Sequence, residues 1–141
     1  MKKFEEYTLE DILYLPAGNK MNALVAEEIM GIEVVWEDPT GFDYEENFGP
    51  CDKNTEDDHG EHEYVKSYSS WYPDTMEMIN SKFKNVEFDI FSYPVGVHSM
   101  NDTRMWSIGM KSYNIYGYSL PHLLAKWALI RRKMEKTAIL D

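Results

Sequence analysis

The chain has 141 residues, of which 43% are hydrophobic and 14% aromatic, and its formal net charge is −11. This length and apolar content predict one folded domain, residues 1–141, and exclude a disordered chain. The chain has one cysteine, no secretory signal at its N-terminus and no apolar run that could span a membrane. We therefore expect a cytoplasmic protein that has no membrane partner.

The N-terminal third predicts two helices and a strand. Thr8 opens TLEDIL as a hydroxyl N-cap followed by acids, which indicates a short helix that ends before Pro16. The next segment predicts a longer helix, with Gly31 as its C-terminal cap. Its apolar residues at helical spacing are Met21, Leu24, Val25, Ile29 and Met30. IEVVWE is rich in β-branched residues and predicts a strand that ends at Asp38.

Residues 41–66 have no hydrophobic period, so we expect a mobile acidic insertion there instead of a core element. Eleven of the 25 acidic residues lie between Glu37 and Glu63, where Lys53 is the one basic residue. The rest of the chain is nearly neutral. Direct binding to nucleic acid is not expected, because phosphate contacts need clustered Lys and Arg. The basic run KWALIRRKMEK is interpreted as a complement to a helix dipole.

The second half predicts a helix, two or three strands and a final helix. SSWYPDTMEMINSKF predicts a helix with a serine or Asp74 as its cap. VEFDIFSY and RMWSIGM predict two antiparallel strands, and YNIYGYS predicts a third strand or an extended approach to the last helix. Ser119 caps that helix, and residues 137–141 form a loose tail. The expected apolar face of the last helix is Leu120, Leu123, Leu124, Trp127, Ala128 and Met134.

This order of elements predicts an α+β fold, in which flanking helices cover a mostly antiparallel sheet of three to four strands. Three segments resemble the phage ABA sandwich domain family: MNALVAEEIMGIEVV, YSSWYPDTMEMINSKF, and MWSIGM with YSLPHLLAKWAL. The resemblance covers roughly residues 20–36, 64–92 and 104–130, and it does not extend to the acidic insertion. It implies an α-β-α sandwich and a phage or prophage protein in a bacterial host cell. It implies no catalytic residues.

The stretch CDKNTEDDHGEHEY, residues 51–64, is a candidate metal site. Its potential ligands are Cys51, Asp58, His59 and His62. The spacing Cys-x7-His-x2-His fits no common structural zinc pattern, and a calcium loop would need glycine where Asp57 stands. We favour a solvated acidic loop over a specific metal site or a protein-binding surface, and we expect no cofactor.

Enzyme chemistry is not expected. Acids around Cys51 raise the pKa of its thiol and suppress the reactive thiolate. The chain has no nucleophile elbow, no phosphate-binding glycine loop and no His-Glu-x-x-His motif. Glu87 and Asp89 share a strand face, which we interpret as a solvent-facing side and not as a catalytic pair.

Aromatic residues near the ends of elements indicate ligand binding, although the same residues could simply fill a small core. An arginine beside an aromatic ring can stack a base, and a helix start can bind a phosphate. The candidate ligand-binding residues are Ser69, Ser70, Trp71, Tyr72, Arg104, Trp106 and Tyr116.

Two mechanisms stay open for an anti-defence or host-takeover factor. In the first, these aromatics and Arg104 sequester a nucleotide-like signal, in a pocket that a homo-oligomer interface could complete. In the second, the acidic residues 37–63 mimic the charge of nucleic acid and block a basic host protein. A metal-binding protein that uses the 51–64 stretch is a third alternative.

Overall fold

The computed structural model describes residues 2–56, 60–94, 104–110 and 113–138. The helices are α1 (Leu9–Leu13), α2 (Asn19–Leu24), α3 (Tyr72–Lys82) and α4 (Leu120–Ala138), with short helical turns η1 (Phe4–Glu6), η2 (Val25–Ile29) and η3 (Glu45–Asn47). The strands are β1 (Val34–Glu37), β2 (Gly49–Glu56), β3 (His62–Tyr64), β4 (Ile90–Pro94), β5 (Arg104–Gly109) and β6 (Asn114–Gly117). None of the described helices is long and apolar enough to cross a membrane.

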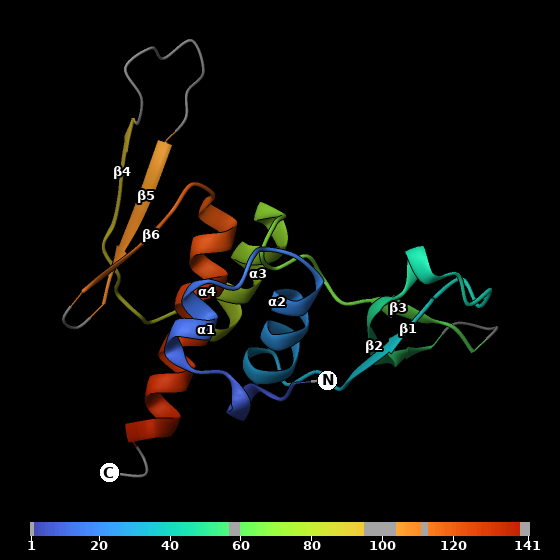
Figure 1. Cartoon of the computed structure of the whole chain (residues 1–141). Helices are drawn as coiled ribbons and strands as arrows, with labels where there is room; N and C mark the ends of the chain where they lie inside the picture. Colours follow the sequence, from blue (N-terminus) through green and yellow to red (C-terminus); the bar gives the residue numbers. More distant parts are fainter. Residues whose placement is uncertain (1, 57–59, 95–103, 111–112, 139–141) are drawn as a thin grey trace.

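The predicted α+β class, with antiparallel sheets and flanking helices, is confirmed. The described strands divide between two three-stranded sheets, β1-β2-β3 and β4-β5-β6, where we had expected one. Figure 1 shows the helices in the middle of the molecule and the two sheets on either side of them. The β4–β5 pair is antiparallel as predicted, with Ile90 opposite Ile108. YNIYGYS contributes the third strand of this sheet, because Ile115 pairs with Ile108.

Residues 41–66, where we expected a mobile acidic insertion instead of a core element, contain two strands. Strands β2 and β3 lie within that segment and extend the sheet that begins with β1. These two strands cannot be recognised from the sequence pattern. Only the first three residues of β2, Gly49–Cys51, are buried, and the rest of the strand is polar. A strand without alternation gives no periodic signal, and its backbone hydrogen bonds to β1 are non-local.

The N-terminal helices begin and end where their caps predict. The Thr8 hydroxyl accepts a hydrogen bond from the Asp11 N–H at 3.0 Å, and the Asp11 carboxylate accepts one from the Thr8 N–H at 2.9 Å. This reciprocal pair satisfies donors that a helix start leaves free. Helix α2 continues into the wider turn η2, and Gly31 follows it at φ 71°, a left-handed conformation that favours glycine.

Helix α4 lies at the centre of the molecule. Every residue from 123 to 130 is buried, because α4 contacts α1, η2, α3, β5 and β6. The prediction of one apolar face was therefore incomplete, because a helix that is buried on every side needs apolar side chains on every face. Trp127 packs against Phe83 and Phe88, with ring centroids 4.9 and 5.0 Å apart.

The basic run at the end of α4 is paired with acids of the N-terminal elements. Lys136 Nζ lies 2.7 Å from a Glu28 oxygen and 3.2 Å from a Glu5 oxygen. Lys133 Nζ donates hydrogen bonds to the carbonyls of Phe4 and Glu5. These partners hold the run against η1 and η2, which the helix-dipole interpretation did not anticipate. The predicted tail, 137–141, overlaps the end of α4 and otherwise lies outside the described residues.

Candidate functional site

The connection between β1 and β2 exposes aromatic and acidic side chains together. We call the seven residues Phe42–Phe48, FDYEENF, the 42–48 loop. Phe42, Tyr44 and Phe48 are 71%, 54% and 52% exposed. The acids of the loop, Asp43, Glu45 and Glu46, are exposed as well. Large aromatic rings left in water among charges are typical of interaction surfaces.

Buried Asp38 holds the start of the loop. One of its carboxylate oxygens accepts hydrogen bonds from the N–H and hydroxyl of Thr40 at 2.8 and 2.6 Å, and the other accepts one from the Tyr44 N–H at 2.9 Å. Burial opposes ionisation of Asp38, but these hydrogen bonds outweigh it and keep the pKa of the carboxyl below its usual value. The loop is thus tied to an ionised side chain at the end of β1.

Further contacts fix the rest of the loop. The Phe42 and Tyr44 rings stack with their centroids 5.8 Å apart. The Tyr64 hydroxyl, from β3, donates a hydrogen bond to the Asn47 carbonyl. An ordered loop loses less conformational entropy when it binds a partner. The 42–48 loop therefore presents its rings and carboxylates in one arrangement before any partner arrives.

The sheet that carries the loop lies at the edge of the molecule. Its contacts with the helices run through β2 and α2, and Figure 1 shows β1, β2 and β3 standing out from the helical centre. Glu56 and Glu63 of this sheet are exposed too. The acidic side chains thus gather on a projecting part of the molecule, where a partner surface can reach them.

The predicted metal ligands are placed only in part. The Cys51 side chain is fully buried, and its Sγ contacts the carbonyls of Glu37 and Gly49 at 3.8 and 3.7 Å. His62 Nδ1 pairs with a carboxylate oxygen of Glu37. Asp58 and His59 lie outside the described residues. Within the described part of the chain, no three His, Cys, Asp or Glu side chains are grouped so that they could hold a metal ion.

Cys51 should react far more slowly in the folded protein than in the unfolded chain. Burial, with the nearby Glu37 carboxylate, raises the pKa of its thiol to about 11. Each pKa unit lowers the thiolate fraction at neutral pH tenfold, so alkylation of the native protein at pH 8 should be at least about 100-fold slower than in urea. Mass spectrometry after timed iodoacetamide treatment measures both rates. Equal rates would show that β2 does not enclose the thiol.

The first group of predicted ligand-binding residues stands at the start of α3. Ser69 is buried, and its N–H and hydroxyl donate hydrogen bonds to Asn22 Oδ1 at 2.9 and 2.7 Å. The Gly18 N–H donates to the Ser69 hydroxyl at 2.9 Å, so this hydroxyl joins α2 to α3. Ser70, Trp71 and Tyr72 are exposed.

The predicted cap of α3 is wrong. Its N-cap residue is Trp71, whose side chain makes no capping hydrogen bond. Asp74 instead accepts a hydrogen bond from the Ser67 N–H at 2.9 Å. The carboxylate thus fixes the turn before the helix.

The second group of predicted ligand-binding residues lies on the sheet β4–β6. The Arg104 guanidinium donates to the Ser92 hydroxyl at 3.2 and 3.0 Å, and Trp106 packs against the core. Tyr116 pairs with Ser107, so its side chain starts on the face opposite that of Trp106. Helix α4 lies between this sheet and α3 in Figure 1, so the two groups stand on different elements.

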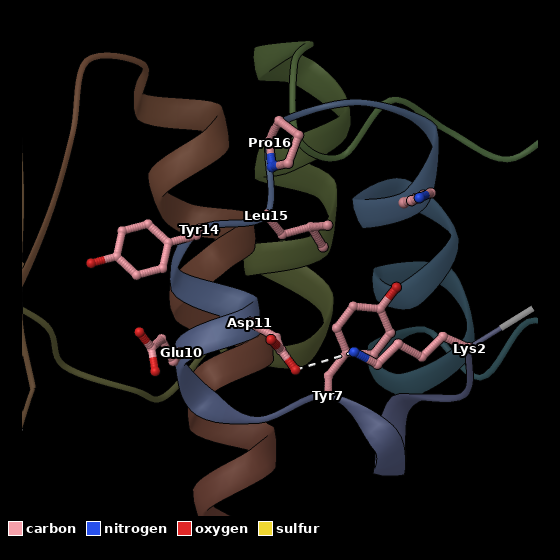
Figure 2. A pocket seen from close by; sticks show the side chains of 8 residues that line it. Lys2, Tyr7, Glu10, Asp11, Tyr14, Leu15 and Pro16 are labelled. Atoms are coloured by element: carbon pink, nitrogen blue, oxygen red, sulfur yellow. Dashed lines mark hydrogen bonds and ion pairs between the residues drawn. The ribbon is translucent and has the colours of Figure 1, made fainter.

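A groove lies between the N-terminal segment, α1 and the start of α2, with a volume of about 410 Å³. Figure 2 shows Asp11 facing Lys2 across it, and their charged atoms are 3.2 Å apart. The Lys2 ammonium also lies 4.6 Å from the centre of the Tyr7 ring. Because Lys2 and Asp11 neutralise each other, the groove offers no strong preference for a charged ligand.

No protein-family model matches the chain, and neither does the sequence of any curated protein. Among solved structures, the chain is similar to a phage protein from Bacillus cereus, with 12% sequence identity and a TM-score of 0.40. The match covers 84% of this chain and 95% of that one. The resemblance to the phage ABA sandwich domain family stays a prediction from the three sequence segments.

Proposed function

We propose that this chain is a non-enzymatic phage or prophage accessory protein that binds a basic host protein through the 42–48 loop. The observation that carries the proposal is the loop itself, in which three exposed aromatic rings alternate with acids on a backbone that Asp38 and Tyr64 hold in place. The resemblance of three sequence segments to the phage ABA sandwich domain family supports a phage or prophage origin. Action inside the bacterial host cell is part of the same proposal.

The chemistry of the loop favours a protein partner rich in arginine. Carboxylates pair with guanidinium groups, and a guanidinium also stacks on an aromatic face. Phosphate backbones would be repelled by a surface of this charge. The aromatic rings supply apolar area that a purely electrostatic mimic of nucleic acid would lack, and buried aromatics contribute much of the affinity in protein interfaces.

Capture of a nucleotide-like signal by Arg104, Trp106 and Tyr116 with residues 69–72 stays a second prediction. Its support is weaker, because the described residues place these two groups on different elements and bury Ser69 in a structural hydrogen bond. Metal binding through residues 51–64 depends on Asp58 and His59, which lie outside the described residues.

The proposal is tested by reversing the charges of the loop. The triple variant D43K/E45K/E46K should weaken binding to a captured and purified host partner by at least about 100-fold, because each residue changes from attraction to repulsion. The matched control, E10K/E87K/D89K, makes the same change of net charge at exposed positions outside the loop. It should change the dissociation constant by less than about threefold, since screening limits the reach of surface charges.

The partner is found by affinity capture from host lysate and is then measured alone by calorimetry. Raised salt should weaken the wild-type complex, and F42A/Y44A/F48A should weaken it at any salt concentration. The proposal fails if the two triple charge variants capture the same proteins with the same affinity, or if the purified partner is acidic at the contacted surface.

A further inference from the structure

Lys126 is a cation inside an otherwise apolar turn of the central helix. It is 8% exposed, and its neighbours on α4 from residue 123 to 130 are buried apolar side chains. Lysine is almost never buried to this extent unless it is paired. Removal from water penalises the charged form and lowers the pKa of the Lys126 ammonium. Burial of the Lys126 ammonium costs free energy, so its position needs a structural or functional reason.

No group in the described part of the chain neutralises this ammonium. Among residues 2–56, 60–94, 104–110 and 113–138, Lys126 has neither a hydrogen bond nor an ion pair, and burial alone accounts for the direction of its pKa. Lys133 and Lys136, on the next turns of the same helix, each reach carbonyl or carboxylate oxygens. Unlike Lys136, Lys126 has no ion pair with an acid of the described residues.

The ammonium borders an open pocket of about 310 Å³ where β6 turns into α4. Ser119, at the N-terminal end of the helix, and His122, in its first turn, line the same pocket. The His122 Nε2–H donates to the Leu15 carbonyl at 2.9 Å, which fixes the ring as part of the wall. Ligand pockets for small molecules begin at about this volume.

Two positive features converge in this pocket. Side chains on a helix lean toward its N-terminus, so the long stem of Lys126 carries its ammonium back toward the first turn of α4. The first turn of α4 forms the positive end of the helix dipole, although Pro121 has no N–H and the His122 N–H already donates to the Ser119 hydroxyl at 3.4 Å. Ser119 adds a hydroxyl at the same end of the helix. An anion in the pocket would meet both the ammonium and the helix start.

The rim of the pocket is aromatic. Tyr116 and Tyr118 line it and are 51% and 67% exposed. A tyrosine ring stacks on flat, apolar groups and binds them without selecting for charge. Tyr116 is among the residues that the sequence marks for ligand binding, although Arg104 and Trp106 do not line this pocket.

We propose that the pocket between β6 and α4 binds a small molecule in which an oxyanion, phosphate or carboxylate, is attached to a flat ring. Lys126 pairs with the oxyanion, the positive end of the α4 dipole adds to the attraction, and Tyr116 and Tyr118 cover the ring. This site is separate from the 42–48 loop, so either proposal stands if the other fails.

The experiment titrates the full chain with two anions and their neutral counterparts. Adenosine 5′-monophosphate is compared with adenosine, and benzoate with benzamide, by calorimetry or by amide chemical-shift changes. At least one anion should bind with one-to-one stoichiometry and at least about tenfold more tightly than its counterpart, as a charge-assisted contact requires. Which anion binds distinguishes a phosphate from a carboxylate ligand.

Lys126→Met should weaken the binding of that anion at least about tenfold, and Lys84→Met, which removes an exposed lysine, should leave it unchanged. Methionine fills a similar volume without a buried charge, so the variant should melt at or above the wild-type temperature. The proposal is overturned if neither anion binds, if the neutral counterparts bind equally well, or if Lys126→Met binds like the wild type.

Discussion

Trp127→Ala should lower the free energy of unfolding by about 3–5 kcal/mol, the largest effect we expect from one substitution in this protein. Trp127 is buried on α4 and contacts Phe83 at the end of α3 and Phe88 in the segment before β4. Its truncation opens a cavity between three elements, and the surrounding backbone of α4 cannot collapse into it because that helix is packed on every side.

Urea unfolding followed by circular dichroism measures this loss without relying on tryptophan fluorescence. The matched control is Trp71→Ala, since Trp71 is 60% exposed at the start of α3. The control should change the free energy of unfolding by less than about 0.5 kcal/mol. Similar losses for both tryptophans would contradict the central position of α4.

Asn22→Ala should cost about 2–4 kcal/mol, because it removes an acceptor from buried donors. Asn22 Oδ1 accepts hydrogen bonds from both the N–H and the hydroxyl of Ser69. Ser69 is fully buried, so water cannot replace Asn22 as the acceptor. The same contact joins α2 to the turn before α3, so its loss also loosens the packing of two helices. Unfolding in urea is again the measurement.

A double-mutant cycle sharpens this test. In Ser69→Ala the hydroxyl is gone, so adding Asn22→Ala should cost clearly less than it does in the wild type. Asn80→Ala, at an exposed position of α3, is the control and should be within about 0.5 kcal/mol of the wild type. Strictly additive losses would mean that Asn22 and Ser69 do not interact.

Local sequence features predicted the helices, strand β1 and the β4–β5 pair. The Thr8 cap and Gly31 act within a few residues of their own helices, so their signals survive in the bare sequence. The β4–β5 pair was predicted because apolar residues alternate in both strands, and Ile90 and Ile108 do pair. The strands β2 and β3 gave no such signal, since most of β2 is polar and β3 has only three residues, so neither shows an alternation of apolar side chains.

The candidate sites depended even more on distant contacts. The alternation FDYEENF is visible in the sequence, but only the structure shows that Asp38 and Tyr64 order it. Periodicity placed Lys126 outside the apolar face of the last helix, and nothing local indicates that other elements enclose that side too. Ser69 was predicted to bind a ligand because it precedes a helix start, and nothing local shows its partner Asn22, 47 positions away.

The chain enters and leaves the β1–β3 sheet at points that lie near each other. The chain enters it after Glu33 and leaves it at Val65, and both residues bond to β2, through the Lys53 N–H and the Pro50 carbonyl. Because β1 and β3 flank a single strand, and these two residues lie opposite positions three residues apart along it, entry and exit are separated by about 14 Å. Four or five residues can bridge that gap. An insertion or exchange of the whole β1–β3 sheet therefore requires no change in the path of the helices on either side of it.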